Sequence, residues 1–201
     1  MSPAFSQRST VFKIDMAKSI ADLTNSVATY IEGLAEKIER GAKLRVGFLE
    51  GSTGYYDGEA VSIPMIAAIQ NFGAPRAGIP PRPFFNDCIE NNKDSWGPAV
   101  ARQLVANDYD GERTMNIVGA GIAAQLKQSI TDTNSPPLSP VTLMLRKMRS
   151  EGGPDFVVNR SVVEEARQRV EAGESYAGVS TKPLIYTGQL QQAVDYEVDS
   201  E

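Results

Sequence analysis

Apolar side chains recur at intervals of three and four residues near the start of the chain, which is typical of one stripe on a long helix. The helix is predicted from about Asp15 to Arg40, and Gly41 supplies its C-terminal stop. Because the stripe is narrow enough for a seam between subunits, we expect this helix to stand away from the core and pack against a neighbour. The stripe consists of Ile20, Leu23, Val27, Tyr30, Ile31, Leu34 and Ile38.

Two other segments alternate apolar and polar residues, which predicts half-buried strands. They are Leu44 to Leu49 and the final strand, Ala193 to Val198, which could pair with the first. The stretch from Glu50 to Glu59 contains Asp57-Gly58 and is predicted to be a flexible hairpin loop. The predicted fold class is α+β. It has a small antiparallel sheet, for which a strand near Val61 is a further candidate, several packed helices, a long N-terminal helix and an extended arm.

Capping residues mark the remaining helices. Ser62 caps a short helix with Pro64 in its first turn, and Phe72 near its end is predicted to face inward. Gly119 and Gly121 lower the intrinsic stability of a later helix and suggest a close helix–helix approach there. The later helices are predicted from Phe85 to about Ala106, from the expected cap Asp108 to about Ile130, from Ser139 through Arg149, and from Ser161 to Ala172.

The stretch from Phe72 to Phe85 contains four prolines and two glycines and ends in paired aromatics. Each proline fixes its own φ and pushes the preceding residue toward extended geometry. The segment is therefore predicted to be a stiff, extended strap that delivers Phe84 and Phe85 to one place. Two interpretations of these rings stay open. They either dock on a neighbour or simply fill the protomer's own core.

The amino-acid composition excludes several kinds of catalytic and metal-binding site. The chain of 201 residues has no histidine, one cysteine and a formal net charge of −5. Histidine-dependent hydrolysis and zinc–thiolate clusters are thereby excluded, and Cys88 is predicted to be a small buried hydrophobe. The acidic balance argues against a protein whose main task is to grip phosphate backbones. With no long apolar run and no signal-peptide region, the protein is expected to be soluble and cytoplasmic when made, with no membrane contact.

Three local motifs are candidates for binding a dinucleotide, calcium, or phosphate and DNA. Gly119 to Ala124 matches a loose dinucleotide-binding fingerprint, but its helical context does not fit one. Asp108 to Glu112 is similar to the opening of a calcium loop, for which helix capping is the favoured explanation. Arg146, Lys147 and Arg149 form a basic cluster, with Arg76 and Arg82 as a looser pair. A phosphate or DNA contact there stays open, and an acidic partner surface or plain solvation is favoured.

Three segments taken together resemble the neck and tail-completion proteins of long-tailed bacteriophages, a family that includes minor tail protein Z-like and virion-morphogenesis proteins. The segments are Phe72-Gly73 with Gly78 to Phe85, then Pro137 to Thr142, then Lys182 to Leu190. The resemblance runs from about Leu44 to the C-terminus. It departs from the family pattern at Tyr186, where an acidic residue is usual, and in the longer segment from Ser150 to Thr181.

The resemblance implies a non-enzymatic virion protein, a tail-completion or neck component that joins the tail to the head as a homo-oligomeric ring. Its implied partners are other neck, connector and tail-tube proteins. Genomic DNA would pass through the lumen without specific binding, past an acidic inner wall. No cofactor is expected. A tail terminator or head–tail connector subunit is the alternative, and a nucleotide-binding enzyme or a DNA-binding packaging factor is less favoured.

The predicted organisation is an N-terminal helical segment 1–41, an α+β core made of 42–149 and 182–201, and an insertion or flexible arm 150–181. The glycine-rich loop and the arm are candidate partner contacts, ordered on assembly. The residues predicted to take part in interactions are Tyr55, Tyr56, Arg76, Ile79, Pro80, Pro81, Arg82, Pro83, Phe84, Phe85, Arg146, Lys147 and Tyr186.

Overall fold

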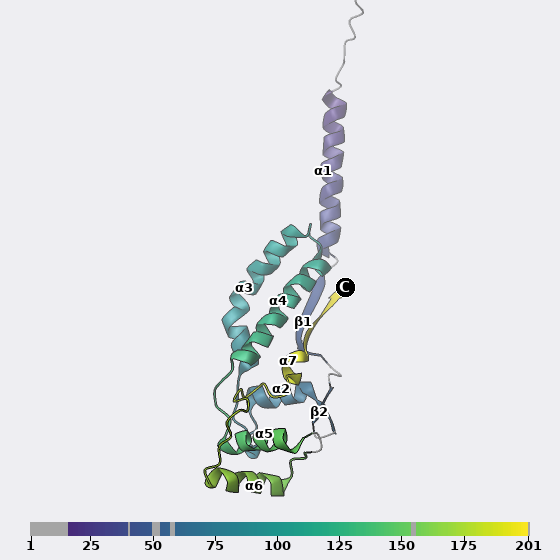
Figure 1. Ribbon diagram of the computed structural model, residues 1–201. Coiled ribbons are helices and arrows are strands. Elements are labelled where there is room, and N and C mark those ends of the chain that lie inside the picture. Colours follow the sequence, from purple (N-terminus) through teal and green to yellow (C-terminus); the bar gives the residue numbers. More distant parts are fainter. Residues whose placement is uncertain (1–15, 40, 50–52, 57–58, 154–155, 201) are drawn as a thin grey trace, which may run out of the picture.

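The computed structural model describes the backbone of residues 16–39, 41–49, 53–56, 59–153 and 156–200, and the side chains of 24–37, 41–49, 53, 61–153 and 156–199. The fold class is α+β, as predicted (Figure 1). The elements are α1 (Met16–Glu39), β1 (Ala42–Phe48), β2 (Thr53–Tyr56), β3 (Glu59–Ser62), α2 (Ile63–Phe72), a 3₁₀ turn (Pro75–Ala77), α3 (Phe84–Ala106), α4 (Gly111–Asp132), α5 (Pro140–Gly152), α6 (Arg160–Glu171), α7 (Gln189–Gln192) and β4 (Val194–Ser200).

The central layer is the predicted antiparallel pair of β1 and β4, in which Val46 lies opposite Tyr196. Helix α4 packs against both strands, and α3 packs against α4 (Figure 1). An added Cβ at Gly119 would lie 2.6 Å from both Leu44 Cδ1 and Tyr196 Cδ2, whereas one at Gly121 would meet nothing within 4 Å. The close approach predicted between two helices is therefore between α4 and the sheet, and only Gly119 takes part in it.

The main core lies where α2, α3, α4 and the C-terminal segment meet the sheet. Phe84 is fully buried and its ring contacts Phe48 edge to face, with centroids 6.2 Å apart. Cys88 is buried as predicted, and this burial raises the pKa of its thiol. The buried cluster consists of Ile63, Ala67, Phe84, Cys88, Ala123, Leu126, Ile130, Leu184, Leu190 and Val194.

The strand near Val61 does not join the main sheet. It is β3, which pairs with β2 in a separate two-stranded sheet. A hairpin between neighbouring strands closes only a short loop, so its entropic cost is small. The predicted loop from Glu50 to Glu59 thus contains β2 and the start of β3, and residues 50–52 and 57–58 lie outside the described part of the chain.

Helix α2 begins as predicted, because the Ser62 hydroxyl accepts the backbone N–H of Met65. The prediction for Phe72 was wrong, since its side chain is 69% exposed. The buried positions of α2 are Ile63, Ala67 and Asn71, which are spaced by four residues. Phe72 lies about 100° further around the helix than Asn71 and so leaves the buried face.

The turn between α3 and α4 also differs from the prediction. Asp108 and Tyr109 have left-handed backbones, with φ of 54° and 59°, so Asp108 cannot cap the helix. Asp110 is the cap, and its side chain accepts the backbone N–H of Arg113 at 2.9 Å. The Asp108 carboxylate instead pairs with Lys37, which connects this turn to α1.

The proline-rich strap is extended over only part of its length. Ala74 bridges to Ile79, and Pro75–Ala77 forms the 3₁₀ turn between them. Gly78 has a φ of 67°, which reverses the chain at low steric cost. Residues 80–83 then run without regular structure into α3. The prediction of a continuous extended strap was therefore wrong for 74–79.

A second apolar cluster joins residues 150–181 to α5. Helix α6 packs against α5, and Met144, Met148 and Ala166 are buried between them. Both helices lie at the end of the molecule away from α1 (Figure 1). The predicted charged helix in this segment thus presents its thin apolar stripe to α5.

Gly119→Ala is expected to lower the free energy of unfolding by about 1–3 kcal/mol, because the new methyl group would push against Leu44 and the Tyr196 ring. Gly121→Ala is the matched control on the same helix. With open space around it, this substitution should raise the free energy of unfolding by about 0.5–1 kcal/mol. Urea unfolding followed by circular dichroism measures both, and equal effects would contradict the proposed packing.

Candidate functional site

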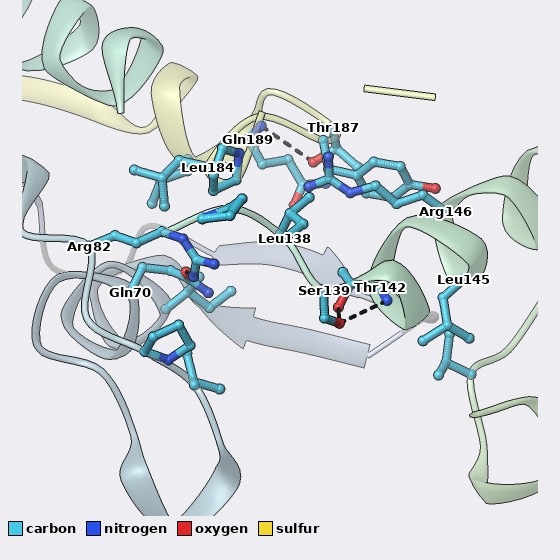
Figure 2. A pocket seen from close by; sticks show the side chains of 18 of the residues that line it. Gln70, Arg82, Leu138, Ser139, Thr142, Leu145, Arg146, Leu184, Thr187 and Gln189 are labelled. Carbon is cyan, nitrogen blue, oxygen red and sulfur yellow. Dashed lines mark hydrogen bonds between the residues drawn. The ribbon is translucent and has the colours of Figure 1, made fainter. Parts of the chain in front are cut away.

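A cavity of about 800 Å³ opens where segments distant in the sequence meet (Figure 2). Its walls include parts of all three segments that carry the family resemblance: 78–82 of the strap, 137–142, and 183–190. Helices α2 and α5 complete it. The three motifs are thus neighbours in space, and this cavity is the candidate functional site.

Arg82 reaches the cavity from the strap and is only 4% exposed. Its Nε donates to the carbonyl oxygen of Pro136 at 3.0 Å, and its Nη1 donates to Oε1 of Gln70 at 3.2 Å. The backbone N–H of Arg82 also donates to the Gln70 carbonyl at 2.8 Å. Arg82 therefore connects α2, the strap and the connector that leads into α5.

Arg146 reaches the cavity from α5 and is 9% exposed. Its Nη1 lies 2.6 Å from the carbonyl oxygen of Ser180, 3.0 Å from that of Lys182 and 3.4 Å from that of Ile185. Its guanidinium carbon lies 4.9 Å from the centre of the Tyr186 ring, a cation–π geometry. Plain solvation of Arg146, one of the two favoured interpretations, was wrong, because the side chain is buried and donates to these carbonyls; contact with an acidic partner stays a prediction.

Two buried arginine side chains bring positive charge to the cavity. Burial lowers the pKa of both Arg82 and Arg146, and the positive charge of Arg82 lowers that of Arg146 further. None of the described residues that line the cavity is acidic. In the described part of the chain, neither guanidinium has a carboxylate partner, since the recorded acceptors are carbonyl and amide oxygens.

Comparisons with protein-family models, with curated proteins and with solved structures found no match to this chain. Among the described helices, none is long and apolar enough to cross a membrane. The described side chains also contain no cluster of three or more acidic, histidine or cysteine groups placed to hold a metal ion. Gly119 to Ala124, the loose dinucleotide motif, lies inside α4 and contributes Gly119 to the contact with the sheet.

The predicted interaction residues separate into distinct groups. The cavity brings together Ile79, Pro80, Arg82, Arg146 and Tyr186. The remaining residues lie elsewhere: Arg76, Pro81 and Pro83 are exposed on the strap, Phe84 and Phe85 belong to the main core, and Lys147 pairs with Glu151 and Glu174. Tyr55 and Tyr56 lie on β2, but their side chains are outside the described part of the chain.

Some lining residues were not predicted. Gln70 orients Arg82, and Gln189 and Thr142 also face this space (Figure 2). Pro136 contributes a backbone carbonyl, which carries no side-chain signal in the sequence. The adjoining Ser139, the predicted cap of α5, lies in the segment Pro137 to Thr142 that carries the resemblance, and its hydroxyl accepts the N–H of Thr142 at 3.1 Å.

Arg146→Met is expected to lower the free energy of unfolding by about 2–4 kcal/mol, because it leaves the carbonyls of Ser180 and Lys182 without their buried donor. Arg76→Met is the matched control, since Arg76 is exposed on the strap, and its effect should stay within about 0.5 kcal/mol. Chemical denaturation midpoints measure both. Equal changes in the denaturation midpoints of the two variants would contradict the structural role of Arg146.

Proposed function

We propose that this protein is a structural component of a long-tailed bacteriophage particle. In this proposal it is a tail-completion or neck protein that joins the tail to the head as a ring of identical copies. The order of the three motif segments supports the family assignment. A tail terminator or a head–tail connector subunit is the alternative role within the same particle. The protein would act without catalysis or cofactor, and DNA would pass the ring without specific binding.

The observation that carries the assembly part of the proposal is the apolar face of α1. Val27, Tyr30 and Ile31 are 55%, 60% and 58% exposed, although they lie on one stripe of the helix. Figure 1 shows α1 extending away from the other elements. Burying a side chain of this size is worth about 1.5–3 kcal/mol, so an exposed stripe of this kind favours association.

The body of the molecule supports a structural role in a second way. Hydrogen bonds to backbone carbonyls tie the segments that resemble the phage family to the residues around them: Arg82 donates to Pro136, next to the second segment, and Arg146 of α5 donates to Lys182 of the third. Such contacts define the shape of the subunit rather than present reactive groups. A protomer with a defined shape loses little conformational entropy when it enters a ring.

The seam hypothesis predicts that Val27→Asp with Ile31→Asp will abolish self-association, because two charges would have to be buried in the apolar contact. Asn25→Asp with Thr29→Asp is the matched control, since it adds the same charge on the opposite side of α1. Size-exclusion chromatography with light scattering gives the mass of each variant. A wild-type chain that stays monomeric at every concentration would disprove the seam.

The proposed role in the particle is tested with a phage that lacks this gene. Electron microscopy should show full heads beside free tails, and adding the purified protein should rejoin them. The Val27→Asp, Ile31→Asp variant should fail in this complementation while its matched control succeeds. Normal infectious particles without the gene would rule out the tail-completion and neck role.

A further inference from the structure

The two buried guanidinium groups of the cavity have donors for which no described residue supplies an acceptor. An arginine carries five N–H donors. For Arg82, the recorded bonds use Nε and Nη1, and none of the described residues accepts from Nη2. For Arg146, all the recorded side-chain bonds come from Nη1, which leaves Nε and Nη2 without an acceptor among the described residues. Donors of a charged group are thus available at both arginines.

The charges themselves are only partly compensated. Two like charges lie close enough for one to lower the pKa of the other, in a site that also lowers both by burial. Carbonyl oxygens, the Gln70 amide and the Tyr186 ring supply partial negative charge, but none of the described lining residues supplies a full one. A bound anion would remove the like-charge repulsion and accept from the unused donors.

The apolar lining of the cavity indicates what kind of molecule the anionic group belongs to. Much of the lining is apolar, and its residues include Ile79, Leu138, Leu145, Leu184 and Leu190. Figure 2 shows Leu138 and Leu184 among the side chains that line the cavity together with the two arginines. At about 800 Å³, the cavity is within the usual range for ligand sites and far larger than a single inorganic ion requires. Apolar walls around a positive centre suit a molecule with an anionic head and an apolar body.

We propose that this cavity is a binding site for a carboxylate carried on an apolar body, with the carboxylate oxygens accepting hydrogen bonds from Arg82 and Arg146. The carboxylate comes either from a free organic acid or from an acidic side chain of a neighbouring copy of the chain. The site does not depend on the role in the phage particle, because it rests on the cavity and its two buried arginines, Arg82 and Arg146.

The first test titrates the wild-type protein with hexanoate, with acetate, hexanol, phosphate and chloride as comparison ligands at equal ionic strength. The side-chain Nε–H signals of Arg82 and Arg146 are followed by nuclear magnetic resonance. Hexanoate should shift both signals in a saturable way, at least tenfold more tightly than acetate. The Arg45 signal is the internal control, because Arg45 is already paired with Glu197 and Asp199. Equal or tighter binding of phosphate or hexanol would overturn the proposal.

The second test places a carboxylate in the site. Gln70→Glu keeps the shape of the side chain that accepts from Arg82, so it should raise the thermal unfolding temperature and weaken hexanoate binding at least fivefold. Gln168→Glu, on the exposed side of α6, is the matched control and should change neither quantity appreciably. Hexanoate binding unaltered by Gln70→Glu would overturn the proposal.

The two sources of the carboxylate give different results as the protein concentration changes. If the carboxylate comes from a free acid, hexanoate binds at every concentration and the mass of the protein stays the same. If it comes from a neighbouring copy, the Arg82 signal moves on self-association without added acid, and hexanoate lowers the mass. A signal that responds to neither hexanoate nor self-association would show that the cavity binds no carboxylate.

Discussion

Two buried arginines hold together the parts of this molecule that are far apart in the sequence. Arg82 connects α2, the strap and the Pro136 carbonyl, and Arg146 connects α5 to three carbonyls between Ser180 and Ile185. A guanidinium suits this task because it offers donors in several directions from one rigid plane. Removing either guanidinium would leave acceptors unpaired, and the contact of the C-terminal segment with α5 depends on Arg146.

This way of joining segments has an electrostatic consequence. Carbonyl dipoles solvate a buried positive charge only partly, and here two such charges share one cavity. A structural role alone would be served equally well by an arginine with an internal carboxylate partner, which would neutralise its charge. The described lining residues provide none, so the same groups that fasten the body also give the cavity its positive potential. The same two arginines therefore both hold the segments together and give the cavity its affinity for anions.

The sequence predicted the elements whose signal is local. The stripe of α1, the alternation in β1 and β4, and the Ser62 and Ser139 caps are each contained in a few neighbouring residues, and all were confirmed. The predictions that were wrong concern features that no local pattern of residues indicates. The burial of Arg146 depends on carbonyls more than thirty positions away, which no charge pattern indicates. Asp110, and not Asp108, caps α4, because a left-handed turn lies between α3 and α4. The spacing of apolar residues gives no sign of such a turn.

The body of the molecule and α1 differ in how their apolar side chains pack. The body buries two apolar clusters, although single side chains such as Phe72 and Val105 are exposed, and arginines fix the connections between its segments. On α1, comparable side chains such as Val27 and Ile31 remain exposed, and an ion pair between Lys37 and Asp108 joins this helix to the body. A surface ion pair contributes little free energy, so it cannot determine the direction of α1 by itself. The partner that covers the stripe would therefore also decide how α1 is oriented on the body.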